Sequence, residues 1–442
     1  MKAPQHPPEA KPDSVDFPKL VSNPSFRNLL TDPLVRGRYV HWDKLRHFEP
    51  PKGLNLEQWW LGLKIARMGG RRFLPLLDKK GKPFSFILPD PAQQLLHSLS
   101  MGIGGKVQLP EKIANKHTRD QYYVSSLIQE SITSSQLEGA TTTRLVAEEM
   151  LRTGRSPRDR SEQMILNNYR TMRRIGELKN QALTVDTVLE LQRLVTEETL
   201  DTRDAAGRIR RPNELVEVVG TDHGEVFHVP PLADELPDRM RKMRDFANGK
   251  GVEGFIHPIV RAIVLHFWLA FDHPFVDGNG RTARALFYWS MLREDFWLAE
   301  FISISSVLVR APARYARAFL YTESDDNDLT YFVLFHLDLL SRAVDELHKY
   351  ISRKTETIQA LEERLRGMES LNYRQRELIS HALRHPRQQY TIQSHMTSHQ
   401  VAWATSRNDL LNLESRGYLK KTRRGNEFVF MPVDDLESTL AR

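Results

Sequence analysis

The chain has 442 residues, contains no cysteine and carries a formal net charge of +7 at pH 7. The lack of cysteine excludes disulfides, thiolate catalysis and Cys-ligated zinc, and it favours a reducing cytoplasm. A hydrophobic content of 40% is typical of a soluble globular protein, and no run approaches the ~18 apolar residues of a membrane span. We expect two or three domains from this length.

The N-terminal part of the chain contains few chemically specific signals. Residues 1–15 are proline-rich and are predicted to be disordered. Residues 16–115 include the pair Trp59-Trp60, which we interpret as packing residues. Beyond residue 118 the apolar spacing is helical. Helices are predicted over 118–139, 144–153, 160–179, 185–199, 231–248, 256–271, 281–293 and 312–322 and from 328 onward.

The helix predicted over 118–139 ends in the segment Ser134-Ser-Gln-Leu-Glu138-Gly139. Ser134 and Glu138 are four residues apart and therefore share one face, where the hydroxyl can hydrogen-bond the carboxylate. A carboxylate that occupies an arginine fork excludes a phosphate that needs the same fork. By itself, however, the segment is more typical of an ordinary capped turn.

A β-hairpin is predicted farther along the chain. The β-prone runs are Leu215-Val216-Glu217-Val218-Val219 and Glu225–Val229, and they flank the turn residues Gly220–Gly224. His223 and His228 have no companion metal ligands, so we interpret them as surface residues.

The most informative stretch reads His273-Pro-Phe-Val-Asp-Gly-Asn-Gly-Arg-Thr-Ala-Arg284. The apolar run Ile259–Phe271 predicts a buried helix that Pro274 terminates, and Gly278-Asn279-Gly280 predicts a tight turn before a second helix. Unpaired N–H groups and the helix dipole favour an anion at the start of that second helix.

The side chains of this stretch suit polyphosphate chemistry. Arg281 and Arg284 lie three residues apart on one side of a helix, and arginine forks grip phosphate oxygens at two points. Asp277 is the kind of ligand with which Mg²⁺ joins phosphates and water. His273, with an ordinary pKa of about 6.5, can take a proton from an attacking hydroxyl.

The last part of the chain changes character. A heptad stripe from Val344 to Met368 indicates a long helix that docks on the chain's own domains or pairs with a second copy, forming a homodimer.

Residues 371–442 show the pattern of a winged helix, with three predicted helices and a hairpin that turns at Gly425-Asn426. This segment holds 11 Lys/Arg against 7 Asp/Glu. It places Ser406, Arg407 and Asn408 on the predicted recognition helix and Arg423 and Arg424 at the wing tip, which suits DNA contacts. Docking of a protein is the alternative.

The segment from His273 to Arg284 resembles the signature of Fic domains, HPFx(D/E)GNGRxxR, with every fixed position present. The resemblance implies a helical Fic core that transfers AMP from ATP to a Ser, Thr or Tyr hydroxyl of a target protein. It implies that His273 is the base, that Asp277 binds Mg²⁺ and that Phe275 packs the loop. The residues implied to hold phosphate are Gly278, Asn279 and Gly280 as the anion hole and Arg281 and Arg284 on the β- and γ-phosphates.

Two further segments are similar to family features. Ser134 to Gly139 matches the inhibitory motif (S/T)xxxE(G/N), which implies an N-terminal inhibitory helix whose Glu138 pairs with Arg284 and blocks the γ-phosphate. The hairpin resembles the flap that clamps the target by main-chain pairing, between a Gly-x-x-Arg that ends at Arg210 and a Val-Pro-Pro that ends at Pro231. Gln192 stands where many members have histidine, a departure outside the catalytic motif.

These observations predict a mainly α protein with five regions: a tail (1–15), a Fic-associated extension (16–115), the Fic domain (116–343), a linker helix (344–370) and a winged helix (371–442). We expect a cytoplasmic protein adenylyltransferase that uses Mg²⁺ and ATP and modifies a target protein and itself, without membrane contact. Two alternatives stay open. One is AMP removal, or transfer of another nucleotidyl or phosphoryl group, at the same site. The other is a DNA-binding regulator with a nucleotide-sensing Fic core.

Overall fold

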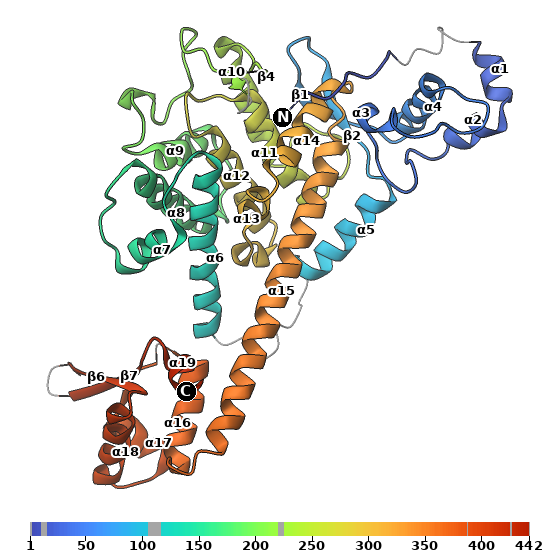
Figure 1. The fold of residues 1–442 in the computed structure, drawn as a ribbon. Helices are drawn as coiled ribbons and strands as arrows, with labels where there is room; N and C mark the ends of the chain where they lie inside the picture. Colours follow the sequence, from blue (N-terminus) through green and yellow to red (C-terminus); the bar gives the residue numbers. More distant parts are fainter. Residues whose placement is uncertain are drawn as a thin grey trace. The chain divides into compact units, whose positions relative to one another are not determined.

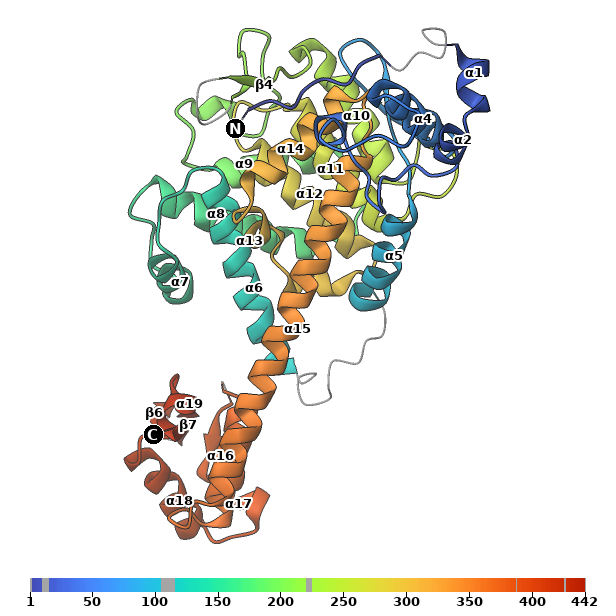
Figure 2. The same cartoon turned by 45° about the vertical axis from the view of Figure 1, so that its right-hand side comes forward.

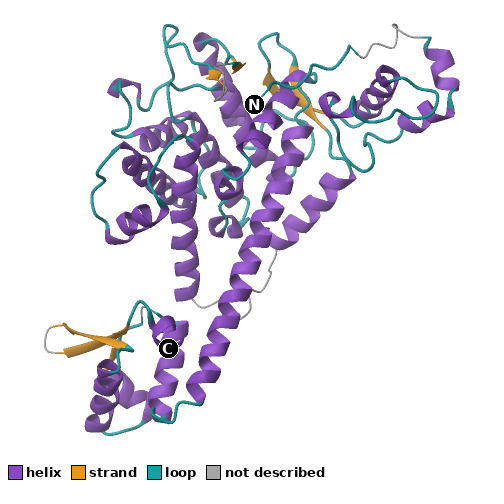
Figure 3. Ribbon diagram, in the orientation of Figure 1, coloured by secondary structure: helices purple, strands orange, loops and turns teal. Residues whose placement is uncertain are grey.

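The computed structural model describes residues 2–9, 16–104, 116–219, 225–386, 388–424 and 427–441. It divides into two compact units, one of residues 1–106 and 126–344 and one of residues 107–125 and 345–442. Helices dominate, and the strands of the described residues form three small antiparallel sheets (Figure 3). The predicted mainly α fold is confirmed. Across the described ranges, no helix is long and apolar enough to cross a membrane.

The N-terminal part of the first unit consists of short elements around α4. Trp59 and Trp60 of α4 are buried, as packing residues should be. Residues 2–9, predicted to be disordered, include Gln5, whose N–H donates to the Asp43 carboxylate at 3.0 Å. The elements are α1 (Phe17–Ser22), α2 (Pro24–Leu29), α3 (Trp42–Leu45), α4 (Leu56–Met68), β1 (Arg72–Leu77), β2 (Pro83–Phe86), α5 (Asp90–Leu99) and the π-helix η2 (Ser100–Gly104).

A buried charged network joins α4 to a segment more than 250 residues later in the chain. Lys64 Nζ lies 2.6 Å from the Asp325 carboxylate. Arg67, fully buried, donates to the Tyr331 hydroxyl at 2.9 Å and lies over the ring of Tyr39. Because a buried charge without its partner is costly, this network holds α4 against the residues that follow α14.

The centre of the first unit is the antiparallel pair α11 and α12 (Figures 1 and 2). Helix α11 is apolar on nearly all sides, and such a helix must be buried. Helices α8 and α9 pack on α12, and α10 packs on α11. The elements are α6 (Lys116–Leu137), α7 (Arg144–Thr153), α8 (Arg160–Leu178), α9 (Val185–Thr196), η3 (Arg203–Ala205), β3 (Val218–Val219), β4 (Val226–His228), η4 (Ala233–Glu235), α10 (Leu236–Ala247), α11 (Pro258–Asp272), α12 (Asn279–Arg293), η5 (Trp297–Phe301), α13 (Ile304–Leu308), α14 (Pro312–Ser324) and α15 (Thr330–Arg366).

The second unit contains the end of α15 and a small α/β module. Leu361 and Leu365 of α15 enter the core of this unit, so this part of the heptad stripe packs within the chain. The boundary predicted between residues 343 and 344 falls inside α15. The remaining elements are α16 (Tyr373–Arg384), β5 (Tyr390–Thr391), α17 (Ile392–His399), α18 (Trp403–Ser415), β6 (Leu419–Arg424), β7 (Glu427–Pro432) and α19 (Leu436–Ala441).

Candidate active site

His273 lies immediately after α11, at the point where the chain leaves the helix. Its backbone has φ 45°, in the left-handed region, and its N–H still donates to the Leu269 carbonyl at 3.0 Å. Pro274 then prevents the helix from continuing. Arg210 fixes this turn, since its Nε donates to the His273 carbonyl at 3.0 Å and its N–H donates to the Pro274 carbonyl at 2.9 Å.

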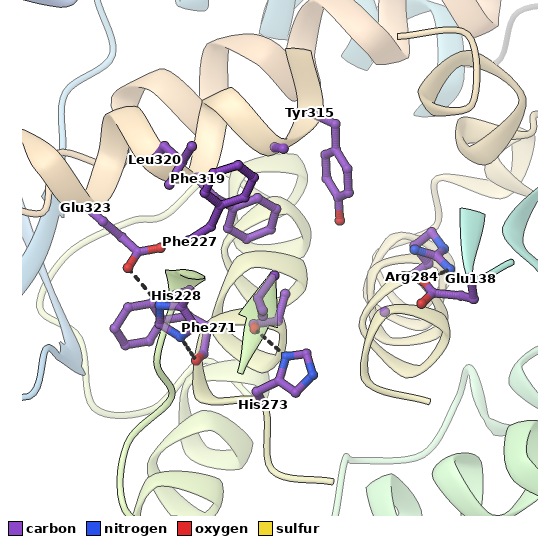
Figure 4. A pocket seen from close by; sticks show the side chains of 14 residues that line it. Glu138, Phe227, His228, Phe271, His273, Arg284, Tyr315, Phe319, Leu320 and Glu323 are labelled. Carbon is purple, nitrogen blue, oxygen red and sulfur yellow. Dashed lines mark hydrogen bonds and ion pairs between the residues drawn. The ribbon is translucent and has the colours of Figure 1, made fainter. Parts of the chain in front are cut away.

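The ring of His273 has the protonation pattern of a base. Its Nδ1 lies 3.2 Å from the Ala270 carbonyl, which only accepts hydrogen bonds, so Nδ1 carries the proton (Figure 4). Burial lowers the pKa of His273 to about 4. The ring is therefore neutral at pH 7, and its Nε2 can accept a proton.

The loop after His273 is closed by the side chain of Asn279. Its Oδ1 accepts from the Phe275 N–H at 3.0 Å, and its Nδ2 donates to the Phe275 carbonyl at 2.8 Å. Phe275 itself is fully buried. The role predicted for Asn279 in the anion hole is thus left to its backbone N–H, because its amide side chain braces the loop.

Glycine is required at two positions of this loop. Gly278 has φ 83°, and a Cβ there would lie 2.7 Å from Thr196 Cγ2. A Cβ at Gly280 would overlap the Glu138 carboxylate, so the start of α12 faces that carboxylate directly. The backbone at Gly280 is the surface that a phosphate would approach.

Arg281 is a buried cation with unsatisfied donors. Its side chain is 1% exposed, and its Nη1 donates to the Val195 carbonyl at 2.5 Å. Within the described residues, Nε and Nη2 have no hydrogen-bond partner, although Nη2 lies 3.6 Å from Asp277 Oδ2. Buried donors without partners are rare in folded proteins. Those of Arg281 are available to bind an anion.

Arg284 is held by the segment that ends α6. Its Nη2 donates to Glu138 Oε1 at 2.8 Å, and its Nε donates to the Ser134 hydroxyl at 2.8 Å. Ser134 therefore bonds Arg284 and not Glu138, contrary to the hydrogen bond anticipated from their spacing. Burial opposes ionisation of Glu138, but Arg284, with Arg281 beyond it, holds the pKa of this carboxyl below its ordinary value.

The residue that follows Glu138 explains how this carboxylate reaches the site. Helix α6 ends at Leu137, and Gly139 has φ 93°, which a residue with a side chain rarely adopts. The chain turns away there, with the Ala140 N–H donating to the Ser135 carbonyl at 3.0 Å. Glu138 thus projects from the helix end toward Arg284.

Glu130, two turns before Glu138, anchors α6 from inside the unit. Its carboxylate is buried and accepts from the Tyr288 hydroxyl at 2.9 Å, the Ser303 hydroxyl at 2.7 Å, and both the hydroxyl and the N–H of Ser305, at 2.5 and 3.1 Å. No sequence signal pointed to Glu130, because its donors lie more than 150 residues away.

We expect Glu130→Gln to destabilise the protein by about 2–4 kcal/mol, because an amide cannot accept all of these hydrogen bonds and leaves buried donors unpaired. Urea unfolding followed by tryptophan fluorescence measures this as a lower midpoint. The control is Glu148→Gln, since Glu148 pairs with Arg144 near the surface, where such pairs contribute about 0–1 kcal/mol. Equal midpoints for both variants would contradict the prediction.

A cavity of about 220 Å³ lies beside these groups (Figure 4). Its walls are mainly aromatic and aliphatic side chains from α14, α11 and the hairpin. His228, interpreted above as a surface residue, lines it: its Nδ1 lies 2.7 Å from Glu323 Oε2 and its Nε2 2.7 Å from the Phe271 carbonyl. His223 lies outside the described residues. The lining residues are Glu138, Val218, Phe227, His228, Ala270, Phe271, His273, Gly280, Arg284, Tyr315, Ala316, Phe319, Leu320 and Glu323.

Gln192, expected to lie outside the motif, in fact hydrogen-bonds the loop that follows His273. Its Nε2 donates to the Asp277 carbonyl at 3.0 Å, and its Oε1 accepts from the Gly207 N–H at 2.5 Å. It therefore ties the loop to the segment that leads into the hairpin. The Asp277 carboxylate, 38% exposed, is left facing the loop opening, with Oδ1 accepting from the Gly278 N–H at 2.5 Å.

The hairpin is shorter than predicted. Val218 pairs with His228, and Val219 pairs with Val226. Leu215, Val216 and Glu217 precede β3 and form no strand, and Leu215 is 88% exposed. The turn predicted at 220–224 lies outside the described residues.

The chain is similar to known proteins in the region of this site. Residues 182–291, which include the loop from His273 to Arg284, match the Fic/DOC family. The chain contains a Fic domain. A protein adenylyltransferase Fic from Nematostella vectensis is 29% identical over 167 residues, covering 38% of this chain and 34% of the relative. That from Drosophila erecta is 28% identical over 159 residues, covering 34% and 30%. The chain thus spans about a third of the length of these curated relatives.

A solved structure supports the fold of the Fic domain and its surroundings. The crystal structure of a Fic family protein from Desulfovibrio desulfuricans G20 superimposes with a TM-score of 0.52 at 21% sequence identity. The match covers 78% of this chain and 96% of that protein. At this identity the likeness concerns the fold alone.

Proposed function

We propose that this protein transfers AMP from ATP to a Ser, Thr or Tyr hydroxyl of a target protein, and to itself. The observation that carries the proposal is a neutral His273, with Nε2 available, beside a cavity that Arg284 and the Gly280 backbone close. The curated relatives that match the Fic domain bear the name protein adenylyltransferase. A base, an anion cradle and an apolar cavity are the parts that nucleotidyl transfer requires.

The geometry supports one way of seating ATP. The phosphates lie at the start of α12, where the Gly280 backbone, the unpaired donors of Arg281 and the fork of Arg284 neutralise their charge. The adenine base enters the cavity, whose mainly apolar walls and few polar groups, among them Glu323, are typical of small-molecule sites. Tyr315 and Glu323 are eight residues apart on α14, a rise of about 12 Å, which suits the length of a nucleoside.

The transfer needs little covalent catalysis from the protein. The target hydroxyl oxygen attacks the α-phosphorus, its proton passes to His273 Nε2, and the bond to the leaving pyrophosphate breaks. Most of the rate enhancement comes from holding the reactants in line and neutralising charge. The Gly280 backbone and Arg281 provide that neutralisation at the phosphates, while Arg210 and Ala270 keep the imidazole in place.

The residues present fit Mg²⁺ at Asp277. The described residues contain no group of three or more His, Asp or Glu side chains that would form a complete metal cage. Asp277 offers one half-exposed carboxylate at the loop opening, and Mg²⁺ is usually bound by one or two carboxylates together with substrate phosphates and water. Bound there, the ion would offset charge on the phosphate oxygens.

We further propose that Glu138 inhibits the enzyme. The contact of Glu138 with Arg284 occupies part of the guanidinium that a γ-phosphate would use, and the Glu138 carboxylate covers the Gly280 backbone. Transfer then requires Glu138 to move away from Arg284.

We also propose that the target segment binds at the hairpin. Strand β3, whose Val219 is 54% exposed, offers the target segment an edge for main-chain pairing.

Intact-protein mass spectrometry after incubation with ATP and Mg²⁺ tests the proposed reaction. The protein, its Glu138→Gly variant and the double variant Glu138→Gly/His273→Ala are compared, each with ATP, GTP and UTP in turn. We expect a mass gain of one AMP in the Glu138→Gly variant with ATP and no gain in the double variant. A gain that persists in the double variant would exclude His273 as the base.

A further inference from the structure

The C-terminal unit has its own core and a recognisable order of elements. Helix α16, strand β5, helices α17 and α18 and the hairpin β6–β7 follow one another, and the sheet order is β5-β7-β6. Helix–strand–helix–helix–hairpin is the order of a winged helix. The core residues are Leu361, Leu365, Leu371, Leu378, Ile379, Ala382, Leu383, Ile392, Leu410, Leu413, Leu419, Phe430, Leu436 and Leu440.

One face of helix α18 packs against the core of this unit, and the opposite face, its bare face, is exposed to solvent. Ser406, predicted to contact DNA, lies on the packed face: it is buried, and its hydroxyl donates to the Ile392 carbonyl at 2.7 Å. That prediction is therefore wrong. Arg407 and Asn408 are exposed on the other face, where Trp403 is 56% exposed and Arg407 lies over its ring.

The carboxylates of this helix are turned away from its bare face or paired. Asp409 accepts from Arg374 Nε and Asn372 Nδ2, both at 2.7 Å, and lies 3.3 Å from His395 Nε2. Glu414 lies 3.9 Å from Lys421 Nζ. Of the three charged residues of α18, Arg407 is consequently the one that is exposed.

The hairpin extends this positive surface. Lys420, Arg423 and Arg424 are exposed on β6, and Lys421 lies over the exposed ring of Phe428 on β7. Glu427 is the one acidic residue of the two strands as described, whose residues are LKKTRR and EFVFMP. The stretch from 403 to 432 has six basic and three acidic residues. Asp409 pairs with Arg374, outside this stretch, and Glu414 pairs with Lys421, one of the six.

We infer that the C-terminal unit binds double-stranded DNA, with α18 in the major groove and the β6–β7 hairpin along the phosphate backbone. Arg407 and Asn408 are of the types that read guanine and adenine edges. Arg423, Arg424 and Lys420 bind phosphates, which position the protein without reading the sequence. The surplus of exposed cations over acidic residues favours a polyanion over a protein, because neutralisation of DNA phosphates by Lys and Arg supplies much of the affinity of DNA binding.

Fluorescence anisotropy of the full chain with a labelled duplex of mixed sequence, several helical turns long, tests this inference across a range of salt concentrations. We expect the variant Arg407→Ala/Arg423→Ala/Arg424→Ala to bind at least about tenfold more weakly at low salt. The slope of log affinity against log salt should fall by about 0.9 for each lost phosphate contact. The control variant, Arg27→Ala/Arg152→Ala/Arg173→Ala, removes three exposed arginines from the first unit and should bind like the parent.

Either of two outcomes would overturn the inference. If the parent chain fails to bind duplex DNA at low salt, α18 presents its bare face to something other than DNA, such as a protein. If the two triple variants lose affinity equally, binding follows net charge and not this surface. A matching thermal melt for both variants shows that the losses do not arise from unfolding.

Discussion

The variant Glu138→Gly is expected to transfer AMP about 100-fold faster than the parent at a limiting ATP concentration. Removal of the carboxylate frees the Arg284 fork and uncovers the Gly280 backbone. Close charge pairs of this kind have coupling energies of about 1.5–7 kcal/mol, and about 3 kcal/mol corresponds to the expected factor. Quantitative mass spectrometry of the AMP-modified protein, taken at initial rates, provides the measurement.

A charge-matched series separates inhibition from a general loss of acidic charge. Glu138→Gln keeps the size of the side chain and should raise transfer in the same direction, because a neutral amide competes weakly for Arg284. Glu197→Gln is the control, since Glu197 pairs with Arg170 at the surface, 3.1 Å away. If Glu138→Gly and the parent transfer AMP at the same rate, Glu138 does not inhibit.

The variant His273→Ala, made in the Glu138→Gly background, is expected to lower transfer by roughly 10²–10⁴-fold, the usual contribution of a positioned base. Its affinity for ATP should change little, because the phosphate contacts belong to Gly280, Arg281 and Arg284. Isothermal titration with ATP and initial rates of transfer give the two quantities. A parallel collapse of ATP affinity would show that His273 binds the nucleotide and is not mainly a base.

The pH profile offers a second test of the same residue. Burial lowers the pKa of His273 to about 4, so the imidazole is a free base throughout neutral pH. Transfer by an enzyme that uses this base should be constant from about pH 8 to pH 5 and should fall as the ring gains its proton near pH 4. Glu138 raises the pKa of His273, so its removal moves the inflection to lower pH. A loss of rate centred near pH 6.5 would contradict the buried, neutral imidazole.

Much of the loop from His273 to Arg284 can be predicted from the sequence, because its polar and glycine residues lie within twelve consecutive positions. Pro274 ends one helix, Gly278 requires a left-handed backbone, and the arginines three residues apart share one side of the next helix. Because these rules depend only on neighbouring residues, the predicted order of helix, loop and helix is confirmed by the structure. The apolar run of α11 likewise predicts its own burial.

The sequence predicts less well which residues far apart along the chain contact each other. Asn279 looks like a turn residue, yet its amide closes the loop on Phe275. Helical spacing pairs Ser134 with Glu138, but the Ser134 hydroxyl accepts from Arg284 Nε, which lies 150 residues away in the chain. The sequence predicts His228 at the surface, because its partners, Glu323 and the Phe271 carbonyl, lie 95 and 43 residues away in the chain.

The sequence by itself determined the helical class, the Fic signature and the residue types of the site, because helix periodicity, turn chemistry and motif spacing depend on near neighbours. The tertiary structure alone decided which groups meet. It brought Glu138 onto Arg284 across 146 residues, anchored α6 through the buried carboxylate of Glu130, and turned Ser406 inward while Arg407 stayed outside. Those outcomes depend on how helices pack and on where buried polar groups find partners, and neither follows from local spacing.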